Sequence, residues 1–250
     1  MNSSDLARRI LAEWKIKLFL GGAITVLFWL GYFHLGYLSR SSARPAPELS
    51  IDRMIPFMPG AAFLYLSEFV ILPLIVWLMT SRRQLLACCR GLSLLIGVSF
   101  FIFCCWPTRV MRPNIPAGQF YFYDLVASTD LTGNALPSLH AGFGLFAAAC
   151  AWDTFQRSKY KWWLIGALWV WTVAIMASTL LIKQHVFLDL AAGGALGLTS
   201  WAFAGRASDR IATLNINTRS RPASGPSPPA KELVGKCPNN IPVEGQKPLP

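Results

Sequence analysis

The sequence predicts an all-α membrane protein, a polytopic bundle of about six transmembrane helices. Its composition is the first reason: 54% of the 250 residues are hydrophobic and only 14% are charged, whereas a soluble domain carries roughly 25% charged residues. The second reason is pattern. Between about residues 17 and 205, apolar runs alternate with short polar connectors, and a helix that crosses the hydrocarbon needs roughly 20 mostly apolar residues.

The expected spans are apolar segments of about that length, each flanked by polar or charged residues. In order, they are Lys17–Leu38, Gly60–Thr80, Gly91–Trp106, Leu136–Phe155, Trp162–Ile182 and His185–Ala204. The third is short, and the sixth begins with polar residues. Within the sixth, Gly193 and Gly197 lie four residues apart, a spacing that favours close contact with another helix.

The net charge of +11 raises the alternative of a nucleic-acid-binding protein, so the distribution of the charge matters. If the amino terminus is cytoplasmic, most of the 23 Lys and Arg residues fall in cytoplasmic segments, as the positive-inside rule expects. The outer side then holds Arg40, Arg44, Arg53, Arg109, Arg112 and Lys183. We therefore predict cytoplasmic termini and contact with anionic lipid, with no nucleic-acid partner.

Two regions of the chain differ in composition. Residues 1–205 form the predicted six-span catalytic domain, whereas residues 206–250 are rich in Pro and basic residues and poor in large apolar ones. A segment of that kind buries too little apolar surface to order itself, which predicts a disordered cytoplasmic tail. The six cysteines show no metal-ligand spacing, and we expect neither a metal nor another cofactor.

Ionisable residues at span ends are informative because a charge inside the bilayer is costly. Of the three histidines, His140 and His185 stand at the starts of the fourth and sixth spans. Both spans run from the outer to the inner side in the predicted topology, so the two side chains should meet at the non-cytoplasmic face. His34, near the outer end of the first span, has no expected partner.

The residues around these two histidines suit phosphoryl transfer. Asp189 lies four residues after His185 and so shares its helix face, where a carboxylate fixes the tautomer and leaves the other ring nitrogen free to attack. His140, near a helix amino terminus, is placed to protonate a leaving oxygen. Arg109 and Arg112, in the preceding outer connector, are candidate clamps for phosphate oxygens. The alternative is a hydrogen-bonded polar cluster that only stabilises the bundle.

At these residues the chain resembles the type 2 phosphatidic acid phosphatase superfamily, whose three motifs are K-x6-R-P, P-S-G-H and S-R-x5-H-x3-D. The corresponding segments here are Arg112-Pro113, Pro137-Ser138-Leu139-His140 and Ser178-Thr179-x5-His185-x3-Asp189. The order, the spacing and the six-span layout agree over roughly residues 60 to 205.

The resemblance implies a role for each matching residue. His185 would be the nucleophile, Asp189 its orienting partner and His140 the general acid. Phosphate would be held by Arg112, Ser138 and Ser178, without a metal. For the two serines, hydroxyls that cap a helix or bond back to it are an equal alternative.

Three departures from the motifs affect the substrate. Cys105 stands where the family has Lys, Leu139 where it has Gly, and Thr179 where it has Arg. Two phosphate-binding cations are therefore missing, and Arg109 and Lys183 are the candidates to replace them. The forms P-S-L-H and S-T-x5-H-x3-D look more like the fungal inositol phosphorylceramide synthase branch, which implies transfer of a phosphorylated head group between lipids.

Three functions stay open at this point. The first is a lipid phosphotransferase that acts on a phospholipid and an alcohol-bearing lipid. The second is a phosphatase that hydrolyses phosphatidic acid or a polyprenyl diphosphate. The third is a non-catalytic membrane protein with a decayed site, against which the intact His140, His185 and Asp189 argue. Glu68, inside the second span, either lines the substrate cavity or makes an interhelical hydrogen bond.

Overall fold

The computed structural model describes residues 3–39, 41–113, 115–130, 133–156 and 158–219. Three quarters of the described residues are helical and almost none of them lie in strands, which confirms the all-α prediction. The elements, in chain order, are α1 (Ser3–Leu11), α2 (Trp14–Ile16), the π-helical turn η1 (Lys17–Gly21), α3 (Gly22–Ser39), β1 (Arg44–Pro45), α4 (Ser50–Met54), the 3-10 turn η2 (Pro59–Ala61), α5 (Ala62–Leu66), α6 (Glu68–Leu78), α7 (Arg82–Cys105), β2 (Thr108–Arg109), α8 (Tyr121–Thr129), α9 (Leu139–Phe155), α10 (Lys161–Leu181) and α11 (Phe187–Arg219).

Five helical segments of the described chain are long and apolar enough to cross a membrane: Trp14–Ser39, Pro59–Leu78, Arg82–Cys105, Lys161–Leu181 and Phe187–Gly205. The remaining expected span, Leu136–Phe155, is the 17-residue helix α9. Most of its side chains are buried, so neighbouring helices rather than lipid surround it. The protein is thus a membrane helix bundle, as its hydropathy predicts.

Helix ends differ from the expected spans because hydropathy locates apolar surface, whereas a helix continues until a residue breaks it. α7 begins at Arg82, ahead of the expected start at Gly91, so the arginines of the predicted connector belong to its first turns. The second span is divided at Ser67 into α5 and α6. α11 continues to Arg219, past the predicted tail boundary at residue 206, since no Pro interrupts it there.

The chain separates into two compact units, Met1–Ala212 and Thr213–Pro250. The part of the predicted tail at residues 220–250 lies outside the described residues. The prediction that the tail is disordered therefore stays a prediction.

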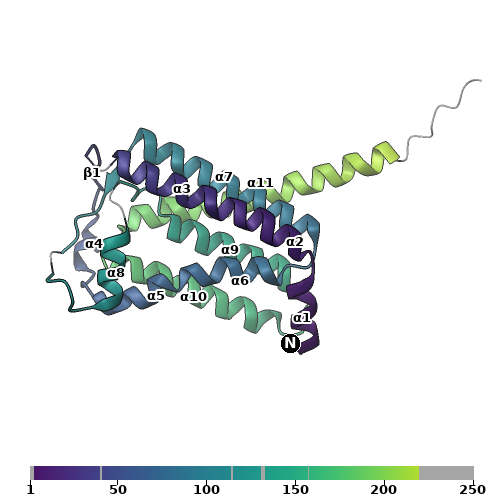
Figure 1. The fold of residues 1–250 in the computed structure, drawn as a ribbon, viewed down its shortest axis with the longest axis horizontal. Coiled ribbons are helices and arrows are strands. Elements are labelled where there is room, and N and C mark those ends of the chain that lie inside the picture. The colour runs from purple at the N-terminus through teal and green to yellow at the C-terminus, as the bar shows by residue number, and fades with distance from the viewer. Residues whose placement is uncertain (1–2, 40, 114, 131–132, 157, 220–250) are drawn as a thin grey trace, which may run out of the picture. The chain divides into compact units, whose positions relative to one another are not determined.

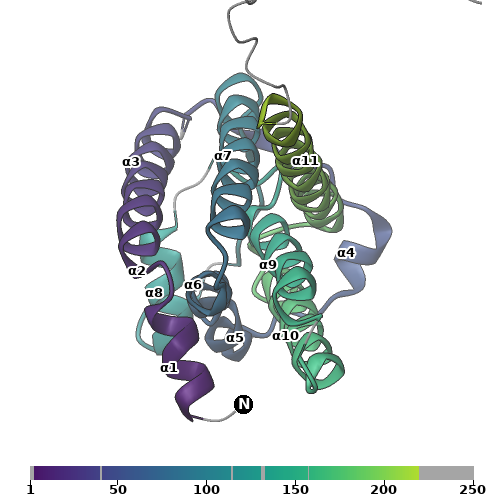
Figure 2. The same ribbon diagram turned by 90° about the vertical axis from the view of Figure 1, so that its right-hand side faces the viewer.

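α9 is the central helix of the first unit. It packs against α6, α7 and α10, and their buried apolar side chains form one continuous core. α3 lies at the edge of the bundle beside α7, and Figure 2 shows it apart from α10 and α11. Lipid-facing positions on α3 are largely apolar and exposed, which is the surface expected of an outer span.

α9 and α11 pack backbone to backbone, as the spacing of Gly193 and Gly197 predicts. A Cβ atom on Gly193 would overlap the carbonyl oxygen of Ser138, and one on Gly197 would overlap that of Gly142. The amide of Ser138 also donates to the carbonyl of Asp189 at 3.0 Å. Glycine is therefore required at this seam, which fixes the start of α9 against the start of α11.

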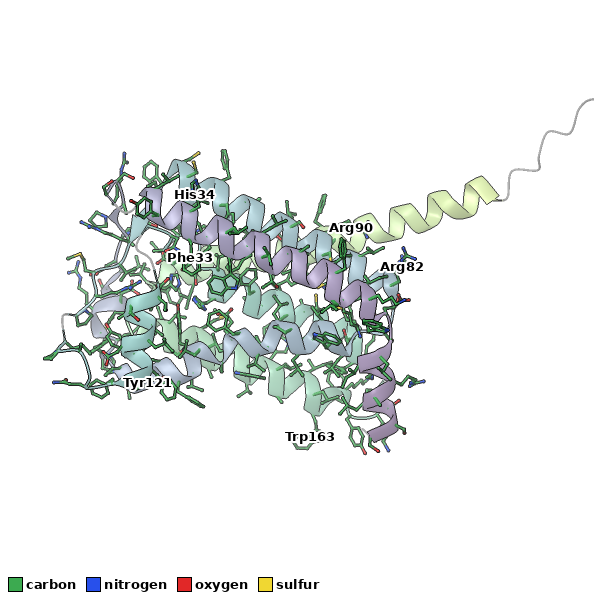
Figure 3. All side chains as sticks on the ribbon, viewed as in Figure 1. Phe33, His34, Arg82, Arg90, Tyr121 and Trp163 are labelled. Carbon is green, nitrogen blue, oxygen red and sulfur yellow. The ribbon has the colours of Figure 1, made fainter. Side chains whose placement is uncertain are left out.

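The short elements gather at one end of the bundle. α4, α8 and β1 lie together there, and α1 lies at the opposite end (Figure 1). Figure 3 places His34 and Tyr121 toward the end with the short elements and Arg82 toward the other. β1 and β2 pair in parallel, with Arg44 opposite Thr108. Thr108 also accepts the amide of Ala135 at 3.0 Å, so this end is a linked loop layer over the helices.

Candidate active site

A cavity of about 870 Å³ opens below this loop layer, between α3, α6, α7 and α9. His140 and His185 both line it, and so do Arg109 and Arg112. The two histidine rings have centroids 5.6 Å apart, although the residues are 45 positions apart in the sequence. The two side chains therefore lie close together, as the sequence predicts.

His140 is held from two sides at the start of α9. Ser138 is the N-cap residue, and its hydroxyl accepts the amide of Ala141 at 3.4 Å. The Nδ1 atom of His140 contacts Oε2 of Glu68 on α6, and the ring of Tyr65 packs on the imidazole with centroids 4.2 Å apart. With Nδ1 paired to a buried carboxylate, Nε2 is the nitrogen left for chemistry.

His185 lies in the tight turn just before α11. Its Nδ1 atom is 3.5 Å from Oδ2 of Asp189, the i, i+4 pair that the spacing predicted. Asp189 is fully buried, and its Oδ2 atom accepts the amide of Val186 at 3.1 Å. Its Oδ1 atom and the Nδ1 atom of His185 have no hydrogen-bond partner among the described residues, so the two side chains are close to each other without being hydrogen-bonded.

Lys183 holds the turn that presents His185. It has a φ of 55°, a conformation that costs a non-glycine residue about 1 to 3 kcal/mol. Its ammonium group donates to the carbonyls of Asp52 at 2.9 Å and Ile55 at 2.7 Å. The carboxylate of Asp52 in turn accepts the amide of Phe187 at 2.7 Å. The lysine therefore braces this turn against the α4 segment, and its role as a phosphate ligand stays a prediction.

Arg112 is paired within the cavity wall. Its guanidinium lies 2.6 Å from Oδ2 of Asp130 and donates to the Asp130 carbonyl at 3.3 Å. The other carboxylate oxygen of Asp130 accepts the hydroxyl of Tyr32 on α3. Arg112 still has a buried Nε–H without a partner in the described part of the chain. It is thus positioned by Asp130 while retaining a free donor.

The remaining predicted phosphate ligands have different surroundings. Arg109 lines the cavity, whereas the hydroxyl of Ser178 donates to the carbonyl of Ile175 at 2.6 Å. At the positions of the missing family cations, Cys105 is exposed and the hydroxyl of Thr179 donates to the Met176 carbonyl at 2.8 Å. Neither residue replaces a positive charge.

A family model described as the PAP2 superfamily matches residues 86–211, half of the chain. The chain belongs to the PAP2 superfamily. No curated protein and no solved structure matches it. The members of this superfamily are phosphatases or phosphotransferases, and membership fits a membrane enzyme that acts on lipid phosphates.

The PAP2 match begins within α7 and ends within α11, and it includes both histidines, Asp189, Arg112 and Asp130. Glu68 precedes the matched region, yet it provides the carboxylate that contacts His140. The superfamily motifs therefore account for one histidine–carboxylate pair, and the fold adds the other. Of the two alternatives for Glu68, the interhelical contact is the one observed, and the side chain also lines the cavity.

Sequence patterns gave no sign of several cavity residues of this PAP2 protein. Asp130 is separated from Arg112 by α8, and no helical spacing relates the two. Gln184 lies beside His185 and is almost fully buried, but neither its amide nitrogen nor its oxygen has a partner among the residues described. The side-chain nitrogen of Asn134 is buried and unpaired in the same way. Both amides line the cavity and offer neutral hydrogen-bond donors to a ligand there.

No group of three or more His, Cys, Asp or Glu side chains with the geometry of a metal site is found within the described ranges. The carboxylates nearest the histidines are occupied by the imidazoles and by Arg112. The side chains that converge on the cavity are therefore those of acid–base and nucleophilic chemistry.

Proposed function

We propose that the protein transfers a phosphorylated head group from a phospholipid to a lipid alcohol through a phosphohistidine at His185. The observation that carries the proposal is the pairing of each cavity histidine with its own buried carboxylate, His185 with Asp189 and His140 with Glu68. Two such pairs facing one cavity supply a nucleophile and an acid for the same phosphorus atom.

In the first step, Asp189 holds the proton on Nδ1 of His185, and Nε2 attacks phosphorus. A P–N bond forms while the bond from phosphorus to the diacylglycerol oxygen breaks, and His140 gives its Nε2 proton to that oxygen. In the second step the acceptor hydroxyl attacks phosphorus, His140 takes the hydroxyl proton, and the P–N bond breaks. The head group ends on the new lipid, and both histidines return to their starting states.

Hydrogen-bond donors around the cavity support binding of the phosphodiester charge. Arg112 and Arg109 line it, and the unpaired amide nitrogens of Asn134 and Gln184 are buried there. A phosphodiester carries one negative charge, fewer than a phosphate monoester, so it needs fewer cations. This charge difference favours head-group transfer for a site in which Cys105 and Thr179 replace Lys and Arg.

The predominantly apolar lining of the cavity also favours a lipid acceptor over water. Besides the polar residues near the histidines, the lining consists largely of side chains such as Phe28, Leu72, Val76, Leu92 and Phe143. An apolar environment limits access of water to a reactive phosphohistidine. Hydrolysis of phosphatidic acid or a polyprenyl diphosphate is the second outcome that the same two histidines would support.

The test is a panel of head-group-labelled phospholipids given to the purified protein with and without diacylglycerol or ceramide. New labelled lipid that requires the acceptor supports the transferase, whereas water-soluble phosphate released without an acceptor identifies a phosphatase. His185→Ala should lower turnover by about a thousand-fold or more, and His34→Ala, at an exposed histidine, is the matched control. Turnover retained in His185→Ala contradicts a phosphohistidine at His185, and the absence of any His185-dependent product would favour the non-catalytic alternative.

The same assay run in EDTA tests the absence of a metal requirement. We expect unchanged turnover, because imidazole nitrogens supply both the nucleophile and the acid. Loss of turnover that added Mg²⁺ or Zn²⁺ restores would contradict the proposed chemistry.

We also propose that the termini are cytoplasmic and that the histidines face the opposite side of the membrane, since this orientation satisfies the positive-inside rule. A cysteine placed at Ser128, exposed on α8, tests it in a variant in which Cys104 and Cys105 are Ala. An impermeant thiol reagent should label this cysteine on intact cells. Labelling only after lysis would reverse the orientation.

A further inference from the structure

The cavity continues well below the histidines. Its upper part is lined by His140, His185 and Arg112, and its lower part by Lys17, Trp77 and Leu85. Glu68 lies at the level of His140, and Trp77 is near the other end of the same helix. At roughly 1.5 Å per residue, the cavity extends about 14 Å along α6, which is close to half of the ~30 Å hydrocarbon thickness of a bilayer.

The bottom of this cavity is closed by a buried lysine. Lys17 is 4% exposed, and its ammonium donates to the carbonyls of Arg9 at 2.7 Å and Trp77 at 2.8 Å. These bonds tie η1 to α1 and to the end of α6. Since both carbonyls come from helix ends, the lysine satisfies backbone groups that would otherwise lack partners. The cavity therefore has a fixed floor.

Immediately above this floor, the Lys17–Gly22 segment leaves open space. Lys17–Gly21 forms a π-helical turn, an irregularity often found at functional sites. Gly21 ends this turn and the exposed Gly22 follows it; both line the cavity, and a Cβ atom on either would meet nothing within 4 Å. At the half-buried Gly21, such open space contrasts with the close packing usual inside proteins.

We propose that this lower cavity binds one alkyl chain of the lipid substrate, with the phosphate at His140 and His185 and the methyl end at the floor formed by Lys17 and Trp77. The inference rests on the proposed function, which puts the phosphate at the histidines. A depth of half a bilayer fits an acyl or sphingoid chain of leaflet length. A polyprenyl chain is longer than this space, so the geometry assigns the substrate to glycerolipids or sphingolipids.

The test uses the full chain in phosphatidylcholine nanodiscs with hexadecyl phosphate that carries a diazirine on its last carbon. After photolysis, mass spectrometry locates the labelled residues. We expect labelling of the Lys17–Gly22 segment and of Val76 and Trp77. The Gly21→Phe variant, which fills the space above the floor, should reduce that labelling about ten-fold.

The matched control is Gly97→Phe, because Gly97 is exposed on α7 and also has open space around it. This variant should be labelled like the wild type. His185→Ala should lose turnover but keep the floor labelling, so a failure of the catalytic proposal is distinguishable from a failure of this one. Labelling confined to the outer, lipid-facing surface, or floor labelling unchanged by Gly21→Phe, would overturn the chain-binding site.

Discussion

The two sides of the cavity are built in opposite ways. On one side, α9 and α11 meet backbone to backbone at Gly193 and Gly197. α9 carries His140, and α11 carries Asp189, the partner of His185. On the other side, α3 is held by aromatic contacts, such as that between Phe28 and Phe143, whose ring centroids are 5.4 Å apart. Below that contact, the preceding turn η1 leaves open space at Gly21. Tight packing thus accompanies the candidate chemistry, which needs fixed geometry, and loose packing accompanies the proposed lipid site.

A methyl group added at the contact between α9 and α11, the tight side of the cavity, tests this contrast most directly. In Gly193→Ala, the new Cβ would approach the carbonyl carbon and nitrogen of Ser138 at 2.8 and 3.0 Å, so the starts of α9 and α11 must separate. We expect about 1 to 3 kcal/mol of destabilisation and about a hundred-fold loss of turnover from the displaced histidines. Thermal unfolding in detergent and steady-state kinetics measure the two effects.

Gly21→Ala is the control on the loose side, where the same methyl group meets open space. It should leave both unfolding temperature and turnover close to those of the wild type. Equal losses in the two variants would mean that the two sides do not differ in the way described.

The next largest effect on turnover is expected at the contact between Glu68 on α6 and His140 on α9. Glu68→Gln keeps the shape of the side chain but removes the charge that stabilises a protonated His140. We expect kcat to fall by about ten- to a hundred-fold, as part of the general acid–base contribution is lost, with little change in KM. The pH profile of kcat should shift, which a purely structural contact would not produce.

Asp153→Asn is the matched control for this charge removal. Asp153 lies near the opposite end of α9, where it accepts the indole N–H of Trp201 at 2.8 Å. Its loss should leave kcat and the pH profile unchanged. If Glu68→Gln behaved in the same way, Glu68 would be a structural residue and His140 would act without a carboxylate partner.

The tight side was largely predictable from the sequence, and the cavity's other walls were not. The proximity of His185 and Asp189 was expected from their four-residue spacing, although His185 lies in the turn before α11 and not on its face, and its approach to His140 follows from the alternation of spans. By contrast, Glu68 and His140 are 72 residues apart, and no periodic pattern relates residues on different helices. The pairing of Arg112 with Asp130 depends on how the chain folds around α8. Hydropathy likewise locates α3 as a span but cannot show which of its faces leaves a space.

The smallest expected effect tests whether the cavity is built for a ligand. Gln184 is 3% exposed, with both polar atoms of its amide unpaired in the described chain. Burying such a group without partners costs about 1 to 3 kcal/mol. Gln184→Met should therefore raise the stability of the ligand-free protein by about 1 kcal/mol, while KM for the lipid phosphate rises by about five- to ten-fold as a donor is lost.

The control is a glutamine whose amide already has a hydrogen-bond partner. Gln84, on α7, donates to the carbonyl of Asp153 at 3.2 Å, so Gln84→Met should lower stability slightly and leave KM unchanged. A stability gain combined with weaker substrate binding is the signature of a polar group held ready for a ligand, because the free protein bears a desolvation cost that binding removes. If Gln184→Met instead lost stability without any change in KM, the amide would belong to the fold, and phosphate recognition would rest on the arginines alone.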